Sequence, residues 1–287
     1  MNGQNGFSKH HGLLEQTQKG FFAVRVRTVA GNLTSDQLRH LAELADKYGN
    51  GQLHITTRQS VELHGVKGDR LEDVFRAIDA SGLLLAVRGP RVLTAISCPG
   101  ATLCKQGISD TRALAARLDA LMVGREQPGK TKIALSGCPN SCAKPQINDI
   151  GLHGVIVPAA VDGCDGCNTC AAVCKVGAIT VRDRVPSIAA ETCVGCGSCV
   201  RSCPRQALVG EKRGYAVYVG GKIGKKSLLG NKVFPFIPEQ EAVTYIEAIL
   251  GAYNRLANKG ERIGDVVNRT GLAAFRQEIL KSDSQQG

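Results

Sequence analysis

Twelve cysteines, gathered in short clusters, constrain this chain of 287 residues more than any other feature. Eight of them lie between residues 164 and 203, in two runs that share the spacing C-x2-C-x2-C-x3-C. The other four form two pairs, one spaced C-x5-C and the other C-x3-C. Clustered thiols bind metal in a reducing compartment, whereas the disulfides of secreted proteins join cysteines scattered over many loops. The spacing therefore predicts a metal-binding redox protein in the cytoplasm.

The two runs resemble the bacterial ferredoxins that hold two four-iron clusters, and Pro204 after the last cysteine fits that pattern. The resemblance covers residues 162–208 and implies that the fourth cysteine of each run ligates the other cluster. Zinc also binds paired C-x2-C units, but it would leave the third cysteine of each run without a role. Lys175 stands where a second proline is usual, which removes no ligand. The implied ligand sets are Cys164, Cys167, Cys170 and Cys203 for one cluster, and Cys193, Cys196, Cys199 and Cys174 for the other.

The remaining cysteines are the pairs Cys98 and Cys104, and Cys138 and Cys142. A predicted helix and strand lie between the pairs, which is enough chain to bring them together. Four thiolates can hold a third four-iron cluster. Disulfides or a zinc site remain alternatives on spacing alone.

The charge balance is basic, with a net charge of +11. Nucleic-acid binding is the obvious alternative, but there is no block of lysines and arginines and no basic motif interleaved with aromatic residues. We interpret the cations either as an ordinary basic surface or as a setting for an anionic cofactor, an anionic substrate and acidic electron donors. No apolar run approaches the roughly eighteen residues of a membrane span. Residues 1–20 are polar and glycine-rich without a signal-peptide core, and we interpret them as a flexible arm.

Periodicity predicts an α+β fold. Thr34 and Gln37 form a capping box before a helix that Gly49 ends. Around it, the first third of the chain has the order strand, helix, strand, strand, helix, which is that of a split α/β sandwich. The predicted strands are 21–29, 52–56, 61–64, 83–94, 130–135, 149–157 and 215–220, and the further predicted helices are 71–78, 110–122, 239–256 and one beyond 261.

Seven short motifs, including both cysteine pairs, resemble the sulfite and nitrite reductases that couple a four-iron cluster to sirohaem. They are SCPGATLC at 97–104, GCPNSCAKP at 137–145, ITTRQSVELHG at 55–65, PRV at 90–92, KTK at 130–132, NDIGLHG at 148–154 and ERIGDVVNRTG at 261–271. With the inserted ferredoxin pattern, the chain looks most like the anaerobic and dissimilatory sulfite reductase branch. The resemblance implies a ferredoxin-like half domain at 21–95, a sirohaem and 4Fe-4S domain at 96–161 and 210–287, and a ferredoxin insert at 162–209.

The resemblance also implies roles for individual residues. In that family the last cysteine of the C-x3-C pair bridges the cluster to the sirohaem iron, which gives this role to Cys142. A sirohaem contact falls on Asn140 and, with packing in a turn equally open, on Gln59; His64 has the same ambiguity. The cations that bind the substrate fall on Arg58, Arg91, Lys130 and Lys132.

Elementary electrostatics supports these cations. Sulfite is a dianion and sirohaem carries several carboxylates, so a site for both requires fixed positive charge. A unit pair about 4 Å apart attracts by roughly 4 kcal/mol at an effective dielectric of about 20, before desolvation. Lys130 and Lys132 alternate on a predicted strand and would face one side. Lys222, Lys225 and Lys226 either contact sirohaem carboxylates or are solvated.

The resemblance implies a six-electron reduction of sulfite to sulfide, with electrons entering at the ferredoxin insert. No GxGxxG-type nucleotide motif is present, so a flavoprotein or ferredoxin donor is implied. Larger relatives take the cations from one half and the cluster cysteines from another, and this chain carries both sets. We therefore expect a homodimer or hetero-oligomer in which chains share sites. Nitrite reduction and a non-catalytic electron carrier without sirohaem are the alternatives.

Overall fold

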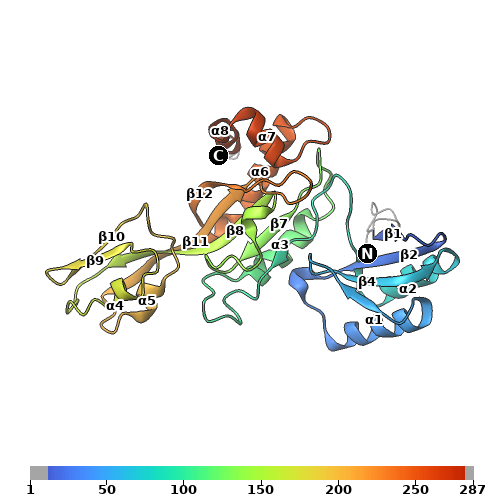
Figure 1. Cartoon of the computed structure of the whole chain (residues 1–287), viewed down its shortest axis with the longest axis horizontal. Coiled ribbons are helices and arrows are strands. Elements are labelled where there is room, and N and C mark those ends of the chain that lie inside the picture. Colours follow the sequence, from blue (N-terminus) through green and yellow to red (C-terminus); the bar gives the residue numbers. More distant parts are fainter. Residues whose placement is uncertain (1–11, 282–287) are drawn as a thin grey trace.

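Two five-stranded sheets organise the chain in the computed structural model, which describes residues 12–281. Figure 1 shows the half domain (residues 12–87) beside the central domain (residues 88–160 and 208–281), each built on one sheet. The insert (residues 161–207) projects from the far side of the central domain. The molecule is therefore elongated, with three parts in a row. No helix within the described range is long and apolar enough to cross a membrane.

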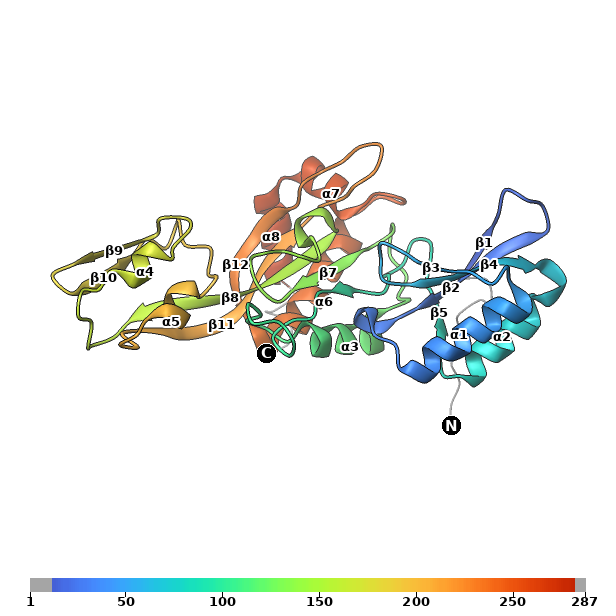
Figure 2. The same cartoon turned by 60° about the horizontal axis from the view of Figure 1, so that its bottom comes forward.

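The half domain is an antiparallel sheet in the order β1-β2-β4-β3, with β5 also paired to β2. Two helices cover one face of the sheet, and their apolar residues pack against those of β2 and β4 (Figure 2). Thr34 caps the first helix as predicted, because its hydroxyl accepts from the Gln37 N–H and the Gln37 side chain accepts from the Thr34 N–H. The bounds are β1 Leu13–Glu15, β2 Phe21–Arg27, α1 Ser35–Tyr48, β3 Leu53–Ile55, β4 Val61–Lys67, α2 Leu71–Ala80 and β5 Leu84–Leu85.

The central sheet has the order β12-β11-β8-β7-β6. Strands β6, β7 and β8 run parallel to one another, and β11 returns antiparallel to β8. Helices α3, α6, α7 and α8 bury their apolar faces in one core with this sheet, where Leu118, Tyr253 and Phe275 are fully buried. The bounds are β6 Ile96–Ser97, α3 Thr111–Met122, β7 Ile133–Ser136, β8 Ile150–Ala160, β11 Leu208–Val219, β12 Asn231–Pro238, α6 Ala242–Leu256, α7 Ile263–Thr270 and α8 Leu272–Lys281.

The insert continues the longest pair of strands in the sheet. Strands β8 and β11 stay paired from Ile150 with Val219 out to Ala160 with Leu208, so they form a ribbon that carries the insert away from the core. The insert has its own small apolar cluster, made largely of cysteines and aliphatic residues. Its elements are α4 Thr169–Ala172, the hairpin β9 Ile179–Arg182 and β10 Val185–Ile188, and α5 Ser198–Ser202.

Three expectations from the sequence need correction. The flexible arm is shorter than predicted, because Leu13–Glu15 pairs with β2; its first eleven residues lie outside the described range. Residues 83–94 form only the two-residue strand β5, since Gly89 has a positive φ and Pro90 follows it. Strand β7 begins at Ile133, so Lys130 and Lys132 lie in the segment just before it.

Candidate redox centre and anion site

The first thiol cluster lies where the parallel strands β6 and β7 end. Cys98 follows β6 directly, and Cys138 comes two residues after β7, so the parallel pairing carries both to one edge, the carboxyl edge. Cys104 and Cys142 lie on exposed loops from the same edge. Burial raises the pKa of Cys138, and the neighbouring Cys98, Cys142 and Cys104 raise it further. The structure thus brings together all four cysteines that the sequence left outside the two runs.

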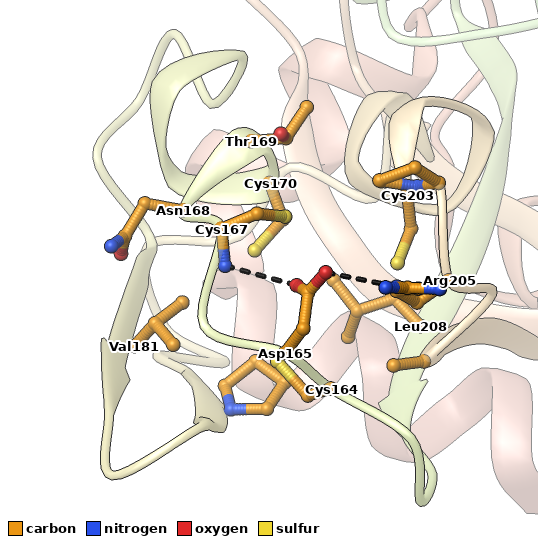
Figure 3. A pocket seen from close by; sticks show the side chains of 13 residues that line it. Cys164, Asp165, Cys167, Asn168, Thr169, Cys170, Val181, Cys203, Arg205 and Leu208 are labelled. Atoms are coloured by element: carbon orange, nitrogen blue, oxygen red, sulfur yellow. Dashed lines mark hydrogen bonds and ion pairs between the residues drawn. The ribbon is translucent and has the colours of Figure 1, made fainter.

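The insert brings seven of the other eight cysteines into two groups. Figure 3 shows one pocket lined by Cys164, Cys167, Cys170 and Cys203, so the fourth member comes from the second run and not from the first. Asp165 also lines this pocket, accepting from the Cys167 N–H at 3.1 Å and from Arg205 Nε at 2.9 Å. In the second group, Cys199 lies within the electrostatic range of Cys193 and Cys196.

The donor set fits iron–sulfur clusters. Backbone N–H groups point at thiol sulfurs, from Gly137 to Cys98 at 3.1 Å and from Ala178 to Cys174 at 3.2 Å, which suits an electron-rich thiolate. Burial raises the pKa of Cys199 to about 11, so at neutral pH this thiol is protonated unless a bound metal stabilises its thiolate. Among residues 12–281, no group of three or more His, Cys, Asp or Glu side chains is arranged for a single metal ion.

Cations gather at the opposite edge, the amino edge, where β6, β7 and β8 begin. Lys132 lies directly before β7 and Asp149 directly before β8. Arg58 reaches the same edge from the turn between β3 and β4, and its guanidinium donates to the Thr94 carbonyl at 2.8 Å and to Asn148 Oδ1 at 3.0 Å. Burial lowers the pKa of Arg58 to about 10, which leaves it charged at neutral pH.

The predicted cations are only partly assembled. Burial, with Arg58, Arg262 and Lys130 as further causes, lowers the pKa of Lys132, so these four cations act on one another. Arg91 lies nearby, since its carbonyl accepts the Thr131 N–H, but its side chain pairs with Glu126 at 2.9 Å. The structure therefore groups three of the four predicted cations, whereas the side chain of the fourth, Arg91, pairs with Glu126.

Other residues with predicted cofactor contacts have partners of their own. The Gln59 amide is held by the Ser97 backbone, donating to its carbonyl at 2.7 Å and accepting from its N–H at 3.0 Å. This contact ties the half domain to the residue before Cys98 and does not support Gln59 as a cofactor ligand. His64 Nε2 contacts Glu62 at 3.1 Å, and Lys222 pairs with Asp265 at 2.6 Å.

The other residues with predicted cofactor contacts, Asn140 and the lysines of the Lys222 loop, include exposed side chains. The backbone N–H of Asn140 hydrogen-bonds toward Cys138 and lowers the pKa of that thiol, while the residue itself is exposed. Lys225 and Lys226 are exposed in the same loop as Lys222. Their contact with a cofactor stays a prediction.

The sequence reasoning missed two residues of the amino edge, the buried Asp149 and the half-buried Arg262. Asp149 is fully buried and accepts two hydrogen bonds from Arg262, at 2.7 Å from Nε and 2.6 Å from Nη2. Both lie in quoted motifs, NDIGLHG and ERIGDVVNRTG, but more than a hundred residues apart, so their spacing carried no signal that they pair. Arg262 stands at the start of α7 and brings the C-terminal helices against the cation cluster.

His153 supports the loop that carries Cys142. Its Nδ1 lies 3.3 Å from the hydroxyl of Ser141, whose φ of 55° is in the left-handed region. Gln146 donates to the same hydroxyl at 2.9 Å. Burial, with Lys232 as a second cause, lowers the pKa of His153 to about 4.

The low pKa of His153 predicts acid sensitivity. Between its unfolded value near 6.5 and its folded value, only the unfolded chain binds the proton, so stability is full above that range and falls as the pH falls. The free energy of unfolding should drop by about 2 kcal/mol between roughly pH 6.5 and pH 5. Urea unfolding of His153→Gln should show a shallower acid slope. The exposed His54→Gln serves as control, and equal slopes in all three proteins would contradict the assignment.

Two sequence comparisons place the chain. The sequence model of the nitrite/sulfite reductase ferredoxin-like half domain matches residues 14–81, and that of the nitrite and sulphite reductase 4Fe-4S domain matches residues 88–286. The chain belongs to the nitrite and sulphite reductase family. The resemblance drawn from the motifs is thereby confirmed, as is the α+β fold with its half domain. The ferredoxin identity of the insert stays a prediction.

Relatives include several proteins named as sulfite reductases. The chain is 37% identical over 273 residues to a coenzyme F420-dependent sulfite reductase of Methanocaldococcus jannaschii, covering 94% of this chain and 44% of that protein. It is 30% identical to an uncharacterized protein of the same organism, covering 91% of this chain and 92% of the other. It is 28% identical to one of the subunits of the anaerobic sulfite reductase of Salmonella typhimurium, covering 92% and 84%. The chain thus spans less than half the length of the first relative.

Solved structures show the same fold. Dissimilatory sulfite reductase I superposes with a TM-score of 0.74 at 23% identity, over 90% of this chain and 69% of that one. The Mycobacterium tuberculosis NirA protein gives a TM-score of 0.68 at 18% identity, over 96% of this chain and 45% of that one.

Proposed function

We propose that the protein reduces sulfite to sulfide with six electrons, using sirohaem coupled to the four-iron cluster of the central domain. The observation that carries this proposal is the pairing of two features in one sheet. Four thiols converge at the carboxyl edge, and Arg58, Lys130 and Lys132 converge at the amino edge. An electron carrier would need the thiols alone. The names of the relatives favour sulfite as the anion.

The residues present suit the proposed cofactors. Cys98, Cys104, Cys138 and Cys142 would hold the cluster, and the exposed Cys142 would also reach sirohaem, beside Asn140. When bound, sirohaem supplies an iron that binds the sulfur of sulfite and passes electrons to it.

The cations have a separate task in this proposal. Arg58 is fixed by its two hydrogen bonds, so its charge is preorganised, and it adds to the field at Lys132. A lysine whose pKa is lowered by burial and by neighbouring cations holds its proton less tightly. Lys132 can therefore bind the dianion and release a proton to an oxygen that leaves as water.

We propose that the insert carries two further four-iron clusters and receives the electrons. Its second cysteine run packs against the central domain: the Ile156 N–H donates to the Gly195 carbonyl at 2.9 Å, and Ile156 also contacts Cys138 and Ile108 in one apolar cluster. Gly195 has a φ of +68°, and a Cβ there would lie 2.9 Å from Val155. Arg201 adds a bond to Gln106 at 2.8 Å, two residues from Cys104.

These contacts give the proposed clusters an order. The group of Cys193 and Cys196 is nearest the central cluster, and the pocket of Figure 3 is more distant and suits contact with a donor. The donor would be a flavoprotein or a ferredoxin.

We also propose that two chains share each site. Lys132 and Cys138 lie at opposite ends of β7, up to about 20 Å apart at roughly 3.3 Å per residue. The cations of a chain therefore point away from the edge that carries its Cys98 and Cys138. In a two-fold dimer, the amino edge of one chain would face the sirohaem of its mate.

The visible spectrum of the anaerobically purified protein tests the proposal. Sirohaem bands that shift when sulfite is added, together with an extractable tetrapyrrole, are the expected result. Iron–sulfur absorption without tetrapyrrole, even after sirohaem is supplied, would leave a cytoplasmic electron carrier instead. Nitrite is the second candidate substrate because a nitrite reductase of Bacillus subtilis is 25% identical. Turnover rates on the two anions separate these functions.

A further inference from the structure

Asp149 is an anionic group placed among the cations of the amino edge. Its side chain is fully buried, and it accepts the backbone N–H of Lys132 at 2.8 Å. A carboxylate in such a position attracts the nearest ammonium or guanidinium group. Left to itself, it would neutralise one of the charges that the proposed anion site needs.

Three cationic side chains lie close to Asp149. Arg58 is already engaged with Asn148 and with the Thr94 carbonyl. Arg262 takes both carboxylate oxygens through Nε and Nη2, the fork geometry that guanidinium groups form with carboxylates. The Lys132 ammonium lies within electrostatic range of Asp149, but within residues 12–281 it forms no ion pair.

From this arrangement we propose that Arg262 is a positioning residue, which occupies Asp149 so that the Lys132 ammonium remains available for the substrate anion. The inference rests on the proposed function, because it assumes that the amino edge binds an anion. It goes further by giving a role to a pair that touches no substrate. Arg262 acts through Asp149, because its own guanidinium is fully paired with that carboxylate.

The consequence of losing Arg262 follows from charge. Asp149 would stay buried without a counter-ion, and the Lys132 side chain, already within its field, would turn to it. Because the Arg262–Asp149 pair is neutral overall, the site would lose one unit of positive charge, the one that Lys132 otherwise offers to the anion. Neutralising Asp149 at the same time removes the reason for Lys132 to turn.

The test compares four variants of the full chain with its clusters. Arg262→Gln removes the counter-ion, Arg262→Lys keeps its charge without the fork, and Asp149→Asn with Arg262→Gln removes the whole pair. Arg269→Gln is the matched control, since Arg269, in α7, also pairs bidentately with a carboxylate, that of Glu261, but at an exposed position. Sulfite and the unreactive sulfate are the probes, with binding measured by calorimetry before sirohaem is supplied.

We expect Arg262→Gln to weaken binding of both anions by about tenfold or more. Arg262→Lys should weaken it less, and the double variant should return to within about threefold of the natural protein. Arg269→Gln should bind as the natural protein does. In loaded enzyme, KM for sulfite should rise in Arg262→Gln more than kcat falls.

A pH profile separates this role from a merely structural one. The groups that face Lys132 are Arg58 from the half domain, Lys130 and Asp149 beside it, Arg262 from α7, and Tyr253 from α6 through Asp149 and Arg262. Losing Arg262 removes a cation and gives Lys132 a carboxylate partner, so the pKa of Lys132 should rise. The pH at which sulfate binding is lost should move upward in Arg262→Gln and not in Arg269→Gln.

Two results would overturn the inference. If Arg262→Gln binds the anions as tightly as the natural protein, the pairing of Arg262 with Asp149 is not what keeps the Lys132 ammonium available. If the double variant is as weak as Arg262→Gln, or fails to fold where Arg262→Lys folds and binds normally, Asp149 is not the reason for the loss. If the natural protein binds neither anion and does not reduce sulfite, the proposed function itself is wrong. That outcome is distinct from the two above.

Discussion

Chains with Lys132→Ala mixed with chains with Cys142→Ser should recover about a quarter of the natural sulfite-reducing activity, although neither variant is active alone. The expectation follows from the two edges of the central sheet. If the cations of one chain serve the sirohaem of its mate, a mixed dimer has one site with both defects and one with neither. Random mixing makes half of the dimers mixed, and each of these has one working site.

Lys132 is a better choice than Arg58 for this experiment. Arg58→Ala would remove the hydrogen bonds to Thr94 and Asn148 that join the half domain to the central domain, so lost activity could reflect lost structure. The Lys132 side chain has no such bond among the described residues, since its contact with Asp149 is through the backbone. Each variant refolded or expressed alone gives the baseline. Mixed samples that stay at that baseline would place each site within one chain.

Cys203→Ala should remove the cluster of the first run, and Cys174→Ala that of the second. The pocket of Figure 3 sets Cys203, the last cysteine of the second run, beside Cys164, Cys167 and Cys170 of the first, so we expect it to ligate the cluster of the first run. Each variant should lose one four-iron cluster per chain, measured as iron content and by paramagnetic resonance of the reduced protein.

Sulfite turnover should fall with either cluster, because the electron path would be broken. Ser202→Ala, next to Cys203 in α5, is the matched control and should retain all clusters. If Cys203→Ala instead removes the signal assigned to the Cys193 group, the ligand sets follow the runs and do not cross between them.

Much of the site could be read from the chain because its chemistry is local. Cysteines three residues apart must lie near one another whatever the fold, so the members of each run were apparent from spacing. The capping box of Thr34 and Gln37 is equally local, and it formed as expected. Lys130 and Lys132 were also singled out by their motif, although the strand assigned to them begins later, at Ile133, and their role at the site stays a prediction.

What the sequence could not show involves partners that are distant in sequence. Gln59 was open between cofactor contact and packing in a turn, and the fold places its amide against the Ser97 backbone, while a cofactor contact stays a prediction. Asp149 and Arg262 pair across 113 residues, and only the packing of α7 on the central sheet brings them together. A residue pattern can indicate a buried charge only when its counter-ion is nearby in the chain.

The amino-acid order alone specifies the ligand chemistry: which thiols form groups, which motifs mark the family, and which cations accompany them. The placement of these groups depends on the folded chain. Parallel pairing of β6 and β7 sends Cys98 and Cys138 to one edge and leaves Lys132 at the other, and the β8–β11 ribbon sets the second cysteine run against Ile156. The physical reason is that ligand identity is a property of single side chains, whereas distance between ligands depends on strand direction and on burial of a shared core.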